Sequence, residues 1–253
     1  MSRFRRPLAL RPATAAAMPA AAIVLAAGLG KRMRPLTATR PKPLVKIAGK
    51  PLIDYALETL RGAGVGRVVV NVHYLADQME AHLKRAARGL DIAVSDERAV
   101  LLETGGGIAR ALPLIGADPF FALNSDNIVI DGPVDSLGLL AERWDPDAMD
   151  ALLLMVPLAR AHGYDGRGDF RMGADGLLER RHGPRLAPFV FSGAQLLKAS
   201  LFDDVPAGAF SMNLIYDRLL AAGRLFGVAH QGLWFHVGTP QSVGATELLL
   251  ADG

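Results

Sequence analysis

Short apolar runs alternate with segments of helical periodicity through the first half of the chain, and this pattern restricts the fold more than any other feature. The runs are Ala22–Ala26, Arg67–Val72, Leu90–Val94 and Phe120–Asn124. The segments between them are Pro51–Ala63, Leu75–Ala87 and Gly107–Ile115. A continuous apolar run is typical of a parallel strand buried on both faces, and an intervening helix returns the chain to the same edge of the sheet. The pattern predicts an α/β fold with a mostly parallel sheet flanked by helices on both faces.

The second half is less regular and predicts a small β lobe attached to this sheet. Strands are expected at Asp150–Val156, Pro188–Ser192, Leu225–Ala229 and Trp234–Val237, and helices at Ser211–Ala222 and Pro240–Ala251. The glycine-rich residues 163–176 between them predict short strands and turns. A chain of 253 residues that is 51% hydrophobic can bury one sizeable core, so we expect residues 21–253 to form a single domain.

The first 20 residues differ from the rest of the chain in charge. They contain four arginines and no acidic residue, whereas the whole chain has 28 basic and 25 acidic residues. We interpret residues 1–20 as a disordered basic extension, with a targeting segment as the alternative. Because the positive charge belongs to this extension, no nucleic-acid partner is expected. The chain has no cysteine and no apolar run of about 18 residues, so neither disulfides nor a membrane span are expected, and a cytoplasmic location is favoured.

A glycine-rich, cationic loop follows the first apolar run. Gly28 and Gly30 are followed at once by Lys31 and Arg32, and Lys42 stands between two prolines a few residues later. Glycines let the backbone approach an anion, and clustered cations neutralise a triphosphate. Met33 occupies the place of the third glycine of a dinucleotide fingerprint, and Arg32 that of the Ser or Thr of a Walker loop, so neither of those sites is present. A plain turn with solvated cations is the alternative for the glycine pair, and it is weakened by the rigidly framed lysine.

The same segment resembles the signature of the sugar nucleotidyltransferase family, L-A-A-G-x-G-x-R-x-x-P-L-T followed by P-K-P-L. Leu25–Thr37 and Pro41–Leu44 contain every fixed element of it. The resemblance implies a Rossmann-like, GT-A-like fold and transfer of a nucleotidyl group from a nucleoside triphosphate to a sugar 1-phosphate. It places Ala26, Ala27 and Gly28 at the base and ribose, Gly30, Lys31 and Arg32 at the β- and γ-phosphates, and Lys42 at the reacting phosphate.

Asp126 is the candidate metal ligand, because it follows the apolar run Phe120–Asn124 at the edge where open α/β sheets bind ligands. The family places a metal aspartate after this strand and a second one in W-x-D-x-G-T. Here His236 stands in place of that second aspartate. We therefore expect Mg²⁺, with Mn²⁺ possible, held by Asp126 as the one carboxylate, and His236 at or near the metal. A capping role is the alternative for Asp126.

Two further segments resemble the substrate pockets of the family. In LETGGGI we expect Thr104, Gly105 and Gly106 to contact the base and Glu103 to contact base or sugar, against a structural helix start as the alternative. In the β lobe, the sugar-binding candidates are Gly168, Asp169, Ser192 and Glu179, against ordinary turn or solvated positions.

The short chain and the LETGGG and GRGDF segments resemble uridylyltransferases that act on N-acetylmuramic acid 1-phosphate, which implies UTP as donor and a role in peptidoglycan recycling. A mannose 1-phosphate guanylyltransferase is the alternative enzyme. A catalytically silent nucleotide-binding relative is the alternative of another class, and His236 is the feature that would favour it.

Overall fold

The computed structural model describes residues 17–251, so the arginines of the predicted basic extension lie outside the described residues. Of the extension, residues 17–20 are described. Met18 packs against the core, and the carbonyl of Ala20 accepts a hydrogen bond from the Arg67 amide at 3.3 Å. This last part of the extension is therefore packed onto the fold. None of the helices within residues 17–251 combines the length and apolar character that a bilayer crossing requires.

Four parallel strands form the core of the main sheet in the order β5-β4-β1-β6. They are β1 (Ala21–Leu25), β4 (Arg67–Val72), β5 (Asp91–Asp96) and β6 (Phe120–Asn124). The connecting helices are α1 (Leu52–Gly62), α2 (Ala76–Ala86) and α3 (Glu103–Ile115). Strands β1, β4 and β6 are almost completely buried because helices cover them, as the continuous apolar runs predict, whereas β5 at the edge of the sheet is mostly half-buried. The predicted α/β fold class is confirmed.

The second half of the chain extends this sheet with further strands. These are β8 (Ala151–Pro157), β10 (Phe170–Met172), β11 (Leu178–Arg180), β12 (Phe189–Leu197) and β13 (Leu225–Ala229). They pair antiparallel with their neighbours except for β13, which pairs parallel with β8. Strand β12 runs antiparallel to both β6 and β8, and its register shifts between Phe191 and Gln195. Gly193 lies in this irregularity with φ +92°, a conformation that favours glycine. The early part of β12 pairs with β10, which begins the small β lobe.

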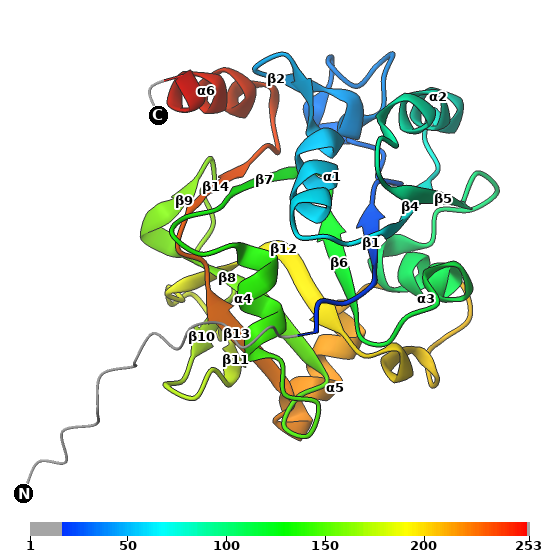
Figure 1. Ribbon diagram of the computed structural model, residues 1–253. Helices are drawn as coiled ribbons and strands as arrows, with labels where there is room; N and C mark the ends of the chain where they lie inside the picture. The colour runs from blue at the N-terminus through cyan, green and yellow to red at the C-terminus, as the bar shows by residue number, and fades with distance from the viewer. Residues whose placement is uncertain (1–16, 252–253) are drawn as a thin grey trace, which may run out of the picture.

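A second, three-stranded sheet carries the late part of the chain back toward β6. It consists of β7 (Asn127–Ile130), β14 (Leu233–His236) and β9 (Ala161–His162). In the antiparallel pairing of β7 with β14, His236 lies opposite Asn127. The amide of Val237 then donates to the carbonyl of Asp126 at 3.2 Å. This pairing brings two segments about 110 positions apart in the sequence together (Figure 1).

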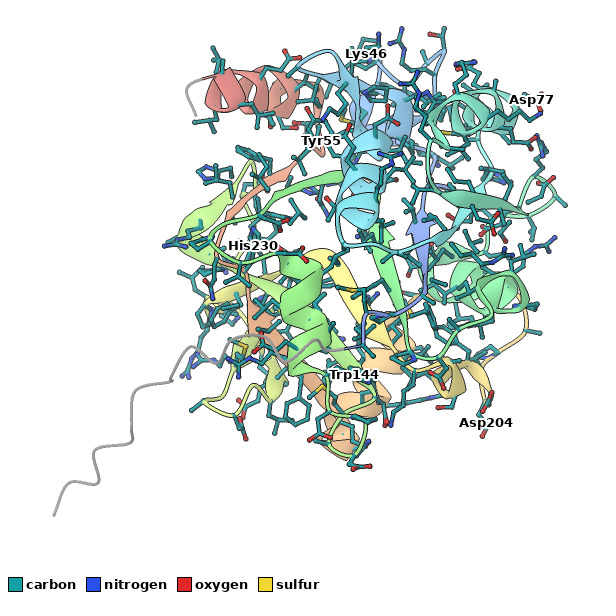
Figure 2. All side chains as sticks on the ribbon, in the orientation of Figure 1. Lys46, Tyr55, Asp77, Trp144, Asp204 and His230 are labelled. Carbon is teal, nitrogen blue, oxygen red and sulfur yellow. The ribbon has the colours of Figure 1, made fainter. Side chains whose placement is uncertain are left out.

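Helices cover both faces of the main sheet. One face packs against α1, α2 and α4 (Ser136–Arg143), and Trp144 at the end of α4 lies against the same core (Figure 2). The other face packs against α3 and α5 (Asn213–Ala222). Helix α6 (Pro240–Ala251) lies apart from both, beside β2 (Lys46–Ile47), which pairs with β3 (Lys50–Pro51). The described part of the chain also contains four short 3-10 helices: η1 (Lys31–Met33), η2 (Lys42–Leu44), η3 (Leu158–Arg160) and η4 (Ala199–Phe202).

Helix α3 begins four residues earlier than the sequence pattern predicts. It starts at Glu103, so the three glycines of LETGGGI lie inside its first turns and are buried. A Cβ on Gly105 would lie 2.3 Å from the Phe210 ring, and one on Gly106 would lie 2.3 Å from the Gly208 carbonyl oxygen. The glycines therefore permit a close approach between α3 and the 208–210 segment, which outweighs their low helix propensity.

Candidate active site

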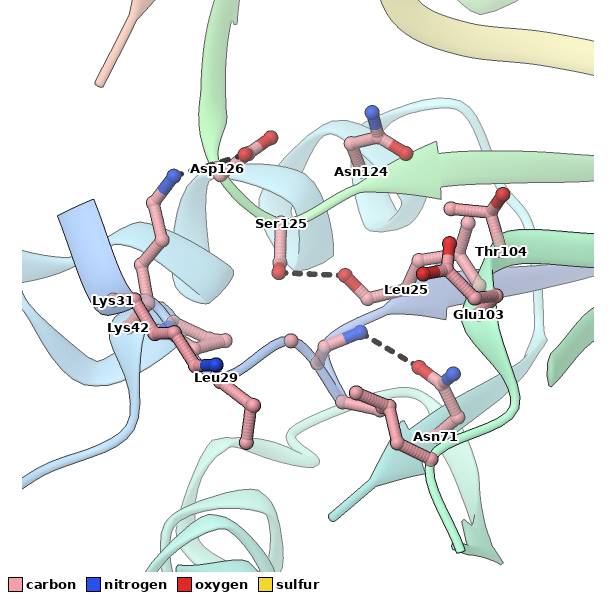
Figure 3. Close-up of a pocket in the computed structure, with 15 residues that line it drawn as sticks. Leu25, Leu29, Lys31, Lys42, Asn71, Glu103, Thr104, Asn124, Ser125 and Asp126 are labelled. Atoms are coloured by element: carbon pink, nitrogen blue, oxygen red, sulfur yellow. Dashed lines mark hydrogen bonds and ion pairs between the residues drawn. The ribbon is translucent and has the colours of Figure 1, made fainter. Parts of the chain in front are cut away.

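A cavity of about 450 Å³ opens where β1, β4 and β6 end. Its walls are the loop after β1, the start of η2, the end of β4, the start of α3 and the Asn124–Asp126 segment after β6 (Figure 3). The carboxyl ends of parallel strands meet at one edge of a sheet, and open α/β folds bind ligands there. The structure therefore brings together the two segments in which we predicted the phosphate loop and the metal carboxylate.

Lys42 and Asp126 form an ion pair in this wall. The Lys42 Nζ atom lies 2.9 Å from the Asp126 Oδ2 atom, and the two side chains are 12% and 30% exposed. Lys42 begins η2 between Pro41 and the buried Pro43, which fixes the backbone from which its side chain extends. The pair joins residues 84 positions apart in the sequence and presents one cation and one anion to the cavity.

Only some of the predicted nucleotide-binding residues in the loop after β1 line the cavity. Ala26, Ala27, Gly28 and Lys31 line the cavity, whereas Gly30 and Arg32 are not in its wall. Gly30 has φ +59°, and a Cβ there would lie 2.9 Å from the Lys42 Cβ atom. Its carbonyl accepts a hydrogen bond from the buried Thr37 hydroxyl at 2.8 Å. Gly30 thus lets the loop pack against Lys42, while Arg32 is exposed and contributes positive charge near His236.

A buried polar network supports this loop, and the sequence analysis did not find it. The Asn71 Oδ1 atom accepts a hydrogen bond from the Ala26 amide at 2.7 Å, and Asn71 Nδ2 donates to Glu97 Oε1 at 2.7 Å. The other oxygen of Glu97 accepts from the Leu102 amide at 3.1 Å. Asn71 and Glu97 are 2% and 1% exposed. The available signal was the single asparagine in the otherwise apolar strand RVVVNV.

At the start of α3, some of the residues predicted to contact the base line the cavity and others do not. Glu103 and Thr104 line the cavity, and Glu103 has φ +63°, which is strained for a residue with a side chain. Gly105 and Gly106 do not line it, because their amides both donate to the Phe210 carbonyl, at 2.9 and 3.1 Å. Their predicted contacts with the base are therefore not supported by their positions, and the glycines pack α3 instead.

A second cavity, of about 460 Å³, adjoins the first and shares Leu25, Glu103, Thr104 and Asn124 with it. Gly168 and Asp169, two of the residues predicted to contact the sugar, line this second cavity. The Asp169 carboxylate accepts a hydrogen bond from the Phe191 amide at 2.9 Å, so its direction is set by β12.

Two other sugar-binding candidates lie away from the second cavity. Ser192 is 1% exposed, and its carbonyl accepts hydrogen bonds from Asn127 Nδ2 and Trp234 Nε1. Glu179 is exposed on β11, where successive side chains point to opposite faces. Its neighbours Arg180 and Arg181 line the cavity, whereas Glu179 does not. The sequence analysis missed both arginines because strand direction was not available to it.

His236 lies beside the Lys42–Asp126 pair. The side-chain amide of Asn127 donates to the Ser192 carbonyl, so its Oδ1 atom must be the acceptor in the 2.9 Å contact with His236 Nδ1. Nδ1 therefore carries the proton of the neutral ring, and Nε2 is the unprotonated nitrogen. Burial lowers the pKa of His236, and the nearby Asp126 carboxylate opposes that effect. Within residues 17–251, no group of three or more His, Cys, Asp or Glu side chains is arranged to hold a metal.

Comparisons with known proteins agree with this geometry. The nucleotidyl transferase family model matches residues 21–180. N-acetylmuramate alpha-1-phosphate uridylyltransferase of Caulobacter vibrioides is 47% identical over 92% of this chain and 98% of its own length. The enzyme of the same name from Neisseria meningitidis serogroup B is 39% identical over 86% of this chain and 93% of its own length.

Solved structures share the fold at lower sequence identity. A putative glucose-1-phosphate thymidylyltransferase from Bacillus anthracis superimposes with a TM-score of 0.76 and 18% identity, covering 92% of this chain and 95% of the other. The family model spans well over half of this chain, and the relatives match it almost end to end. The chain therefore belongs to the nucleotidyl transferase family and is a sugar-1-phosphate nucleotidyltransferase.

Proposed function

We propose that the enzyme transfers the uridylyl group of UTP to N-acetylmuramic acid α-1-phosphate, giving UDP-N-acetylmuramic acid and pyrophosphate. The observation that carries this choice of substrates is the 47% identity over 98% of a relative named for that reaction. The two adjoining cavities suit it, because one has the cationic loop and the other the small β lobe. The reaction would return a cell-wall amino sugar to nucleotide form, which places the enzyme in peptidoglycan recycling in the cytoplasm.

The protein groups of the first cavity suit transfer by positioning and charge neutralisation. The nucleophile, a sugar phosphate oxygen, is already an anion, so no general base is needed. Lys42 would hold the reacting phosphates, and Lys31, together with the exposed Arg32 outside the cavity wall, would neutralise the phosphates that leave as pyrophosphate. In-line attack on the α-phosphorus then forms one P–O bond and breaks another, and the aligned cations stabilise the charge that moves to the leaving group. The backbone of Ala26–Gly28 and the Thr104 side chain are the proposed base and ribose contacts.

A divalent metal fits beside Asp126. Mg²⁺ typically binds proteins through one or two carboxylates and takes its remaining ligands from phosphates and water, so a single carboxylate facing the phosphate cavity is sufficient. Of the two oxygens of the Asp126 carboxylate, hydrogen bonds among the described residues occupy only Oδ2. Mg²⁺, or Mn²⁺ in its place, would supply Lewis-acid neutralisation of the phosphate oxygens. His236 would act at the edge of this site, and its replacement by alanine should change the metal concentration that activity requires.

An activity panel tests this function. The purified protein is incubated with Mg²⁺, with each of the four ribonucleoside triphosphates and dTTP, and with several sugar 1-phosphates, and pyrophosphate release is measured. We expect the highest kcat/KM with UTP and N-acetylmuramic acid 1-phosphate. Turnover only with GTP and mannose 1-phosphate would replace this substrate pair by the alternative. No turnover with any pair would favour a silent nucleotide-binding relative.

A pair of aspartate variants tests the site. Asp126→Asn should lower kcat by at least about 100-fold at every metal concentration, because it removes the one carboxylate of the proposed metal site. Asp204→Asn is the matched control, since Asp204 is an exposed residue at the lower edge of the molecule in Figure 2, outside both cavities. Full activity of Asp126→Asn would contradict the assignment.

A further inference from the structure

The second cavity contains two adjacent arginines whose charges are balanced differently. Arg180 has a counterion within the protein, because its Nη2 atom lies 2.8 Å from an Asp217 carboxylate oxygen. Its guanidinium also donates to Asn213 Oδ1 at 3.2 Å and lies over the Phe170 ring, 5.4 Å from the centroid. Arg180 therefore helps to hold α5 against the β lobe, and its charge is already paired.

Arg181 is held in place by backbone carbonyls. Its Nε atom donates to the Gly168 carbonyl at 2.9 Å and Nη1 donates to the Gly183 carbonyl at 2.5 Å. Among residues 17–251, no carboxylate lies within 4.0 Å of this guanidinium. The Nη2 atom has no hydrogen-bond partner among the described residues, and it is not buried. It is therefore open to solvent, and the residue lines the cavity. Two backbone carbonyls thus fix a cation that has donors left for a ligand.

The acidic residues that line the second cavity do not act as counterions of Arg181. The Asp169 carboxylate is directed toward β12 by the Phe191 amide, and its other oxygen accepts a long hydrogen bond from the Tyr164 hydroxyl at 3.4 Å. Glu103 lies at the boundary with the first cavity. A fixed, half-buried cation without a counterion favours binding of an anion by charge-assisted hydrogen bonds.

The proposed sugar carries such an anion. N-acetylmuramic acid differs from N-acetylglucosamine by a lactyl ether on O3, which ends in a carboxylate. O3 is carried by C3, two ring positions away from the anomeric carbon that bears the 1-phosphate. The residues proposed to hold the phosphates, Lys42 and Asp126, line the first cavity, whereas Arg181 lines only the second. A sugar phosphate bound across both would direct O3 away from the phosphates and into the cavity that contains Arg181.

We propose that Arg181 binds the carboxylate of the 3-O-lactyl group and thereby selects N-acetylmuramic acid 1-phosphate over N-acetylglucosamine 1-phosphate. This assignment rests on the proposed function. A guanidinium suits it because its planar fork can donate two parallel hydrogen bonds to one carboxylate.

The test compares kcat/KM for these two sugar phosphates at saturating UTP. Arg181→Gln should lower the preference for N-acetylmuramic acid 1-phosphate by about 10- to 100-fold, mainly through KM, because a hydrogen bond between charged groups is replaced by a neutral contact. Arg181→Lys should retain part of the preference. Arg171→Gln is the matched control, since Arg171 is exposed on the adjacent strand β10 and outside the cavity, and it should keep the wild-type ratio.

A second measurement uses the unaltered enzyme and so does not depend on the folding of a variant. Methyl esterification of the lactyl carboxylate should lower kcat/KM of the wild-type enzyme by a similar factor. Equal use of acid and ester would overturn the assignment, as would an Arg181→Gln enzyme that keeps the wild-type preference or loses activity equally with both sugars. A wild-type enzyme that prefers N-acetylglucosamine 1-phosphate would instead overturn the proposed function along with it.

Discussion

Replacing Asn71 by alanine would disconnect the loop after β1 from the carboxylate beneath it. The Asn71 side chain makes two buried hydrogen bonds, accepting from the Ala26 amide and donating to Glu97. Both neighbours are almost completely shielded, with Ala26 4% and Glu97 1% exposed. The substitution therefore leaves one amide proton and one carboxylate oxygen without their partner, although both belong to residues that the fold shields.

The cost follows from those two groups. An unsatisfied buried amide costs about 1–3 kcal/mol and a charged group more, so we expect Asn71→Ala to lower the free energy of unfolding by about 3–5 kcal/mol. For a domain of this size that corresponds to a Tm lower by about 6–20 °C. Because Ala26 lines the first cavity, the KM for UTP should rise as well.

Urea denaturation and steady-state kinetics measure the two effects. A double-mutant cycle with Glu97→Ala isolates the link, because the double variant removes the carboxylate that Asn71→Ala leaves unpaired. The loss in the double variant should be smaller than the sum of the single losses by at least about 1 kcal/mol. Gln78→Ala is the matched amide control. Its exposed side chain donates one hydrogen bond, to the Thr39 carbonyl at 3.0 Å, so the change should stay within about 0.5 kcal/mol.

Two results would refute this reasoning. An Asn71→Ala enzyme with a free energy of unfolding within about 1 kcal/mol of the wild type would show that water or local relaxation satisfies the orphaned groups. Additive losses in the cycle would show that Asn71 and Glu97 act independently.

Three further variants test other parts of the structure. Gly106→Ala should destabilise the protein by about 1–3 kcal/mol in urea denaturation, because the new Cβ would lie 2.3 Å from the Gly208 carbonyl oxygen. Gly244→Ala, a change in α6 with open space around the new Cβ, should stabilise the protein by up to about 1 kcal/mol. Equal effects of the two substitutions would contradict the packing argument. Glu103→Gly should raise Tm slightly, because glycine adopts the φ of +63° found at this position without strain, and it should lower kcat/KM because it removes a side chain. A lower Tm together with lower activity would contradict the assigned strain. The hydrogen-bonded Arg224 lowers the pKa of Asp150 from 3.8 to about 2, so this carboxylate stabilises the fold above pH 3.8 and the contribution is lost as the pH falls toward 2. Asp150→Asn should therefore flatten the acid branch of the stability curve, and an unchanged slope would exclude that contribution.

The sequence by itself determined the architecture and pointed to the ion pair in the wall of the first cavity. Strand β6 and helix α6 have the bounds that the pattern predicts, and the parallel core follows from apolar runs separated by helices. Lys42 and Asp126 were predictable because each lies beside a local marker, a proline frame in one case and the end of an apolar strand in the other. Such features depend on neighbours within a few positions, which is the range over which backbone conformation follows from residue type.

The tertiary structure alone decided which candidates reach the cavities. Gly105 and Gly106 resembled ligand-contacting glycines, but their amides are paired with Phe210, about a hundred positions away. Ser192 is turned into the core, and Asn71 joins the site through a carboxylate on the next strand. These outcomes depend on strand register and on long-range hydrogen bonds. A one-residue change of register reverses the face to which a side chain points, and no local pattern specifies which distant group will satisfy a buried donor.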